Sequence, residues 1–188
     1  MIDSVPPASA EQLISEFRRG EMVLLVLDQS DGGQTGVVAM AAECCEASHV
    51  TFMARQARGL VSLALTEARC EQLNLPPMVD PATSGAVKLS IEASTGIDTG
   101  ISAADRARTV RVAVAPDAKP SDLVQPGHVF PVATLSGGVL IRTGAAEAGV
   151  DLATLAGLTP AAVFAEVLDT HGELADASAL VAFADAHD

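Results

Sequence analysis

Two charged groups frame one stretch of this sequence. Arg142 opens a glycine-containing turn, 142–144, that precedes a helical pattern, and Glu166 lies inside the apolar run 161–168. Backbone N–H groups at a helix start can hold an anion together with an arginine. A carboxylate in an apolar strand can exchange protons with a ligand. The first residues of the intervening helix add only Glu147 to this chemistry.

Two more loops place polar groups beside apolar strands. Asp105 and Arg106 fall in a first helical turn, Thr109 follows one turn later, and His128 lies in a turn bracketed by proline and glycine. Ordinary interpretations stay open, because Asp105 suits any helix start, His128 suits any turn and Glu166 could face solvent at a sheet edge. From the residues alone, the sequence predicts a small anionic ligand without defining a reaction.

Apolar periodicity predicts the elements that carry these groups. Helices are expected at 8–20, 48–57, 66–75, 102–115, 145–157 and 177–187. Strands are expected at 22–27, 37–42, 60–65, 86–94, 128–135, 137–142 and 161–168. The predicted N-caps are Ser9, Ser48 and Ser102, the last in a capping-box-like pattern with Asp105. Short strands mixed irregularly with helices predict an α+β fold, a mixed three-layer domain.

Composition limits the function classes. A chain of 188 residues with 49% hydrophobic residues can bury a full core, so one domain over 1–188 is expected. The net charge of −13 argues against nucleic acid or an anionic membrane as a partner. Residues 1–21 lack a signal-peptide pattern and the apolar run 22–27 is too short to span a bilayer, which favours a cytoplasmic setting. The three cysteines are expected to be reduced and to act as small apolar residues.

Five motifs stand in order along the chain: S-A-A-D-R, K-P-S-D-L, P-G-H-V-F-P, G-G-V-L and D-L-A-T-L-A-G. Together they resemble the 3,4-dihydroxy-2-butanone 4-phosphate synthase family of riboflavin biosynthesis, and the similarity runs from Ser9 to His187. The resemblance implies a mixed sheet covered by helices. It also implies a homodimer with active sites at the subunit interface, in which His128 of one subunit faces the pocket of the other.

The family releases formate from ribulose 5-phosphate with one or two magnesium ions, held by a Glu of an acidic loop and by a His. The family loop reads D-D-E-D-R-E-N-E-G-D, and residues 28–37 here read D-Q-S-D-G-G-Q-T-G-V. Asp28 and Asp31 are kept. The family's Arg, metal-binding Glu, second Glu and final Asp fall on Gly32, Gly33, Thr35 and Val37.

The family's R-G-G-H-T-E-A motif reads R-T-G-A-A-E-A here, from Arg142. By the resemblance, Ala145 stands in place of the metal-binding His and Ala146 in place of the phosphate-contacting Thr. The family's T-S-x-Y-G-T-G-F stretch is shortened to T-S-G-A-V-K-L and lacks the aromatic residue. The domain is also expected to be truncated at the C-terminus, because the sequence stops before the family's last strand and helix.

These departures predict that the family magnesium site is lost and that no cofactor is used, because Gly33 and Ala145 offer no side-chain oxygen or nitrogen ligand. The leading hypothesis is a divergent enzyme performing metal-free acid–base chemistry, such as enolisation, dehydration or cyclisation, on a small polar or phosphorylated substrate in a biosynthetic pathway. The alternatives are a non-catalytic paralogue that binds a sugar phosphate or flavin-related ligand or pairs with an active synthase, and a conventional synthase.

The candidate residues follow from both lines of reasoning. The candidate catalytic residues are Glu166 and His128. The candidate substrate-binding residues are Arg142, Thr143, Gly144, Glu147, Asp105, Arg106, Thr109, Asp28 and Asp31.

Overall fold

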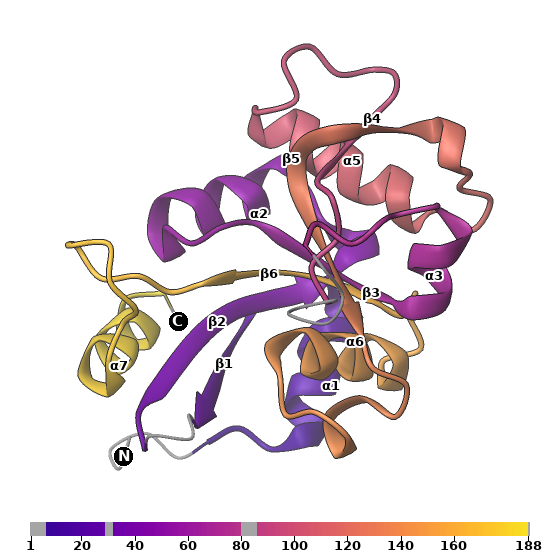
Figure 1. Cartoon of the computed structure of the whole chain (residues 1–188). Helices are drawn as coiled ribbons and strands as arrows, with labels where there is room; N and C mark the ends of the chain where they lie inside the picture. The colour runs from indigo at the N-terminus through magenta and orange to yellow at the C-terminus, as the bar shows by residue number, and fades with distance from the viewer. Residues whose placement is uncertain (1–6, 29–31, 80–85, 188) are drawn as a thin grey trace.

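A computed structural model describes residues 7–28, 32–79 and 86–187, and its strands form one six-stranded sheet in the order β1-β2-β6-β3-β5-β4 (Figure 1). The strands are β1 Val23–Asp28, β2 Gln34–Ala41, β3 Ser62–Thr66, β4 Ile91–Ala93, β5 Leu123–Thr134 and β6 Ala161–Glu166. The β3–β5 pair is parallel and the other pairs are antiparallel. The sheet is therefore mixed, as the sequence predicts.

Helices cover both faces of this sheet. They are α1 Ala10–Arg19, α2 Ala47–Phe52, α3 Glu67–Gln72, α5 Ala103–Val114, α6 Ala145–Leu155 and α7 Ala177–Ala186. Helices α2 and α5 pack on one face, and α1 and α6 pack on the other (Figure 1). The α+β three-layer architecture is therefore confirmed. No helix within the described ranges is long and apolar enough to cross a membrane.

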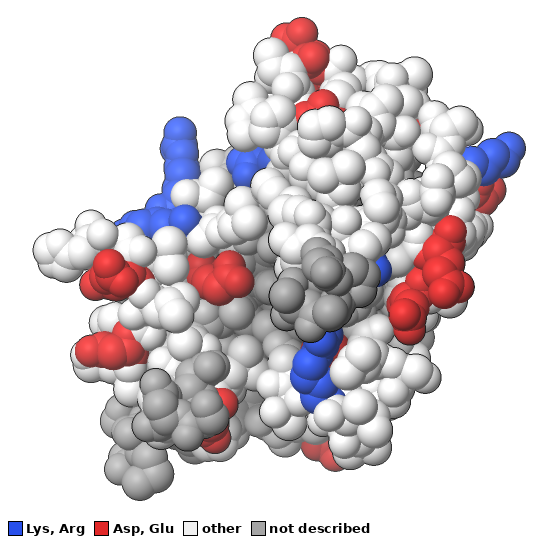
Figure 2. Space-filling view, viewed as in Figure 1, with Lys and Arg blue, Asp and Glu red and all other residues white. Residues whose placement is uncertain are grey.

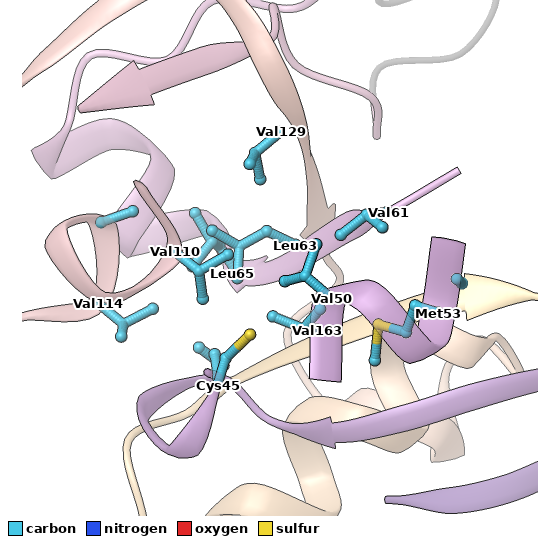
Figure 3. Packing of buried hydrophobic residues seen from close by; sticks show 14 of the residues in the cluster. Cys45, Val50, Met53, Val61, Leu63, Leu65, Val110, Val114, Val129 and Val163 are labelled. Atoms are coloured by element: carbon cyan, nitrogen blue, oxygen red, sulfur yellow. The ribbon is translucent and has the colours of Figure 1, made fainter. Parts of the chain in front are cut away.

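The core divides into two apolar clusters because side chains alternate between the faces of a strand. Leu63, Leu65 and Val163 pack with the α2 and α5 side chains on one face (Figure 3). Val37 and Phe164 pack with α1 and α6 on the other. Glu166 follows Phe164 by two residues on β6, so its side chain belongs to the α1/α6 face.

The helix starts test the predicted N-caps. The Ser9 hydroxyl accepts a hydrogen bond from the N–H of Gln12, and the Ser102 hydroxyl accepts one from the N–H of Asp105, so both predictions are confirmed. Ser48 is not a cap, because α2 begins earlier, after Glu46. The stretch predicted as one helix through 57 continues as a π-helical turn over 53–57.

Two predicted strands differ from the structure. The stretch 137–142 forms a short 3₁₀ helix, Gly138–Leu140, because Gly137 and Gly138 both adopt positive φ angles that an extended strand does not use. The predicted strand 86–94 shrinks to β4, where the register with β5 shifts between Ile91 and Glu92. Local alternation of residue types does not encode such a shift.

The cysteines behave as the sequence predicts for small apolar residues. Cys44, Cys45 and Cys70 form no disulfide, and Cys45 and Cys70 are buried. Burial raises the pKa of Cys45 to about 12 and that of Cys70 to about 11. Both thiols are therefore protonated at neutral pH, and neither is a reactive nucleophile.

Candidate active site

Glu166 ends β6 beside the hairpin that β1 and β2 form. In the β2–β6 ladder Glu166 stands opposite Val37, which is 3% exposed and belongs to the α1/α6 cluster. The backbone of Glu166 is approached closely by Gly59, where an added Cβ would lie 2.1 Å from the Glu166 carbonyl oxygen. Only a glycine fits there, and this contact fixes the strand end that presents the carboxylate.

The start of α6 carries an ion pair. Arg142 Nε donates to Glu147 Oε1 at 2.9 Å, and Arg142 Nη2 donates to the same oxygen and to the Ala133 carbonyl at 3.1 Å. The N–H of Leu135 also donates to Glu147 Oε1, at 3.1 Å. Glu147 is 1% exposed, whereas the Arg142 side chain remains 38% exposed. The pair ties the turn before α6 to the end of β5.

This pairing changes the electrostatics of the predicted anion site. The Glu147 carboxylate offsets much of the Arg142 charge. Besides Arg142, the N-terminal amides of α6 supply positive potential that can attract an anion. Gly144 is the N-cap, and an added Cβ there would lie 2.5 Å from Glu147 Oε2. Thr143 is exposed beside it. Anion binding by these residues stays a prediction.

The positions that the resemblance assigns to family polar groups are apolar here. Ala146, in the first turn of α6, lies in the same apolar cluster as Val37, and Ala145 packs against that cluster. Together they present methyl groups toward the face that carries Glu166. We call Val37, Arg142, Ala145, Ala146, Glu147 and Glu166 the α6 site.

The described residues do not fit the family magnesium site. No group of three or more His, Cys, Asp or Glu side chains within 7–28, 32–79 and 86–187 could hold a metal ion. Asp28 Oδ1 accepts a hydrogen bond from the Gln34 side-chain amide at 2.9 Å, and Asp31 lies outside the described residues. Because magnesium needs several oxygen ligands, the donors among the described residues fall short of that requirement.

The polar residues of α5 bind the end of β4 and the loop before the helix. Asp105 Oδ2 accepts a hydrogen bond from the N–H of Gly100 at 3.0 Å instead of closing the predicted capping box. Thr109 Oγ1 accepts from the N–H of Ala93 and donates to the Asp105 carbonyl, both at 3.0 Å. Burial acts to raise the pKa of Asp105, but hydrogen bonds from Ser102 and from loop N–H groups hold it below its ordinary value.

Arg106 and His128 face different surroundings. Arg106 Nε is buried without a hydrogen-bond partner in the described part of the chain, and burial lowers the pKa of its guanidinium. His128 Nδ1 contacts Glu92 Oε1, and the imidazole keeps 43% of its surface exposed. Sequence reasoning missed Glu92. The available signal was a carboxylate within the alternating pattern 86–94.

Most of the described candidates separate into two groups, and Asp28 and Arg106 belong to neither. One is the α6 site, with Thr143 and Gly144 beside it. The other is the His128 network, which we define as Glu92, Gly100, Asp105, Thr109 and His128. One cleft of about 570 Å³ lies between the ends of β3 and β5 and helix α6. None of the candidate residues lines it.

Charge on the visible surface is mixed. Lys and Arg side chains stand in separate places among acidic ones on the face shown in Figure 2. This face therefore presents no continuous basic patch of the kind that binds a phosphate backbone.

Comparison with known proteins identifies the relatives of this chain. Residues 11–188 match the family model for 3,4-dihydroxy-2-butanone 4-phosphate synthase. A protein of that name from Pseudomonas syringae pv. tomato is 52% identical over 180 residues, which cover 94% of this chain and 48% of the relative. The chain thus spans about half the length of several curated relatives that it matches.

Solved structures agree with this assignment. A two-domain 3,4-dihydroxy-2-butanone 4-phosphate synthase from A. baumannii matches with a TM-score of 0.89 and 46% identity, over 96% of this chain and 54% of that one. A 3,4-dihydroxy-2-butanone 4-phosphate synthase in complex with two magnesium ions matches with a TM-score of 0.87 and 36% identity, over 96% and 90%. This chain belongs to the 3,4-dihydroxy-2-butanone 4-phosphate synthase family.

Proposed function

We propose that this chain binds a small anionic polyol of the sugar-phosphate class at the α6 site and moves protons there through Glu166, without a bound magnesium ion. The observation behind the proposal is that the chain keeps the family fold but has apolar residues in the α6 site where the resemblance assigns polar ones. Glu166 stays at the strand end opposite Val37, on the face of the sheet where Val37 and Ala146 are buried and Ala145 packs against them.

The chemistry follows from the groups that remain. The first amides of α6 and the exposed part of Arg142 attract the anionic end of the ligand. Glu166 then acts as the general base toward a C–H beside a carbonyl, and the same carboxyl returns the proton. The reaction class is an enolisation, dehydration or cyclisation. His128 is the second acid–base candidate, contributed across a subunit interface.

The test uses ribulose 5-phosphate in deuterated buffer that contains a chelator. We expect slow exchange of protons beside the carbonyl for deuterium, followed by proton NMR, with no formate. Glu166→Gln keeps nearly the same volume and removes the base, so exchange falls at least about 100-fold while calorimetric binding is nearly unchanged. Glu173→Gln, at an exposed glutamate, is the matched control. Equal exchange rates in wild type and Glu166→Gln would remove Glu166 from the mechanism.

The anion site needs a conservative variant. Arg142→Ala is expected to abolish ligand binding, but it also strips the buried Glu147 of its partner. Arg142→Lys retains a positive charge beside Glu147 and loses the paired N–H donors. We expect Arg142→Lys to stay folded and to weaken binding of ribulose 5-phosphate about tenfold, or 1.4 kcal/mol. Unchanged affinity would place the anion elsewhere.

A non-catalytic paralogue is the second candidate. Its support is the burial of Val37 and Ala146 in the apolar cluster, which fills part of the space that polar groups would use. Such a protein binds a sugar phosphate or pairs with an active synthase, and it shows no proton exchange in wild type or in Glu166→Gln. Magnesium-dependent release of formate would instead identify a conventional synthase.

A homodimer is part of the proposal. Apolar side chains stand exposed just before Arg142, with Leu140 91% and Ile141 66% accessible in the single chain. A second copy covering them would place a protein surface beside the α6 site. Light scattering at micromolar concentration checks this assembly, and a monomer would contradict it.

A further inference from the structure

The His128 network contains the Glu92 carboxylate, which lies against the imidazole ring of His128. Glu92 lies on β4 with its side chain 15% exposed, and its Oε1 contacts His128 Nδ1. The β4–β5 register jumps at this point, because Ile91 pairs with Val129 and Glu92 pairs with Val124. His128 lies in the stretch of β5 that this jump skips. An irregularity of this kind redirects side chains that a regular ladder would hold apart.

Two glycines leave room for the Glu92 side chain. An added Cβ on Gly100 would lie 1.9 Å from Glu92 Oε1, and one on Gly127 would lie 2.4 Å from Glu92 Cγ. Gly100 also has a φ of +79°, a conformation that other residues rarely adopt. Any larger residue at either position would displace the carboxylate from His128.

Side chains hold both glycines in place. The N–H of Gly100 donates to Asp105 Oδ2 and the N–H of Gly127 donates to Ser90 Oγ, each at 3.0 Å. Thr109 binds the N–H of Ala93, one residue after Glu92, at 3.0 Å. Asp105 and Thr109 of α5 therefore fix the backbone on either side of the Glu92 side chain.

We propose that Glu92 is a positioning residue for His128, which fixes the imidazole proton on Nδ1 and leaves Nε2 as the proton acceptor. A carboxylate only accepts hydrogen bonds, so the ring nitrogen that faces it carries the hydrogen. In the neutral ring the lone pair then lies on Nε2. The role of His128 toward a substrate rests on the proposed function, but the protonation pattern of its ring does not.

The test is a long-range proton–nitrogen NMR spectrum of the full ¹⁵N-labelled chain, recorded at alkaline pH where imidazole rings are neutral. The chain has four histidines, so His128→Asn identifies the signals of His128. We expect the wild-type ring in the Nδ1–H form. In Glu92→Gln the amide N–H can donate to Nδ1, so we expect the Nε2–H form to gain population. Glu21→Gln, at an exposed glutamate near α1, leaves the spectrum unchanged.

A wild-type ring in the Nε2–H form would overturn the proposal, whether or not Glu92→Gln folds. The proposal is also wrong if Glu92→Gln folds and retains the wild-type pattern. Neither NMR measurement needs a ligand or turnover, so failure of this proposal can be distinguished from failure of the proposed function.

Discussion

The α6 site and the His128 network lie on one scaffold and differ in how their polar groups are used. In the α6 site, Val37 and Ala146 have joined the apolar core, and Arg142 is paired with Glu147. In the His128 network, Glu92, Asp105 and Thr109 each have a defined partner. The contrast shows that α6 packs through apolar contacts and one ion pair, whereas α5 packs beside a hydrogen-bonded polar network.

Restoring a family residue probes the α6 site most strongly. Val37→Asp places a carboxylate in the apolar cluster, so we expect a loss of more than about 3 kcal/mol in the free energy of unfolding, measured by denaturant titration. Val26→Asp, on the exposed side of the neighbouring strand, should cost about 1 kcal/mol or less. Near-wild-type stability of Val37→Asp would show that the site has kept an open polar pocket.

Breaking the ion pair should have the next largest effect. Arg142→Ala leaves the Glu147 carboxylate buried without its charged partner, which costs about 3 kcal/mol. This is the lower end of the usual range because Arg142 is 38% exposed. The double variant Arg142→Met with Glu147→Leu removes both charges and should recover most of the loss in thermal unfolding. Equal losses in the single and double variants would mean that the pair does not account for the cost.

A smaller loss is expected in the His128 network. Thr109→Val preserves the shape of a fully buried side chain but leaves the N–H of Ala93 without its acceptor. This change should cost about 1–3 kcal/mol. Thr109→Ser keeps the hydroxyl and should cost less than Thr109→Val. The reverse order, measured by chemical unfolding, would assign the effect to packing alone.

The smallest effect should appear in acid. The folded-state pKa of Asp105 lies below its ordinary value of 3.8, so the unfolded chain binds this proton first as pH falls. Stability from Asp105 is therefore present above that value and is lost as pH falls through the folded-state pKa. Asp105→Asn should be less stable than wild type at neutral pH and show a shallower acid transition. Parallel pH curves for both proteins would contradict this origin.

Local signals predicted the parts of the fold that short stretches determine. Ser9 and Ser102 cap helices because their hydroxyls bond to N–H groups three residues ahead, which is a feature of sequence spacing. The apolar runs that became β3 and β6 are likewise readable from the sequence. The prediction of a strand over 137–142 was wrong because an apolar run does not reveal the positive φ angles of its two glycines.

The site was less predictable because tertiary contacts assign its partners. Arg142 and Glu147 were both singled out, but their pairing depends on a turn that brings the guanidinium over the first turn of α6. Glu92 was missed because its contact with His128 depends on the register jump between β4 and β5. Asp105 and Thr109 were expected to bind substrate, which stays a prediction. Their hydrogen bonds to Gly100 and to Ala93 of β4 are tertiary contacts that the sequence does not reveal.

Formate release from ribulose 5-phosphate measures whether the α6 site works without magnesium. The assay follows formate by proton NMR after ribulose 5-phosphate is added to the protein with excess magnesium, beside an active family synthase. Because Gly33 and Ala145 offer no side-chain ligand, we expect no formate above the protein-free control, and no magnesium binding by calorimetry beyond that of an acidic surface. Magnesium-dependent formate release at the rate of the active synthase would show that the chain is a conventional synthase.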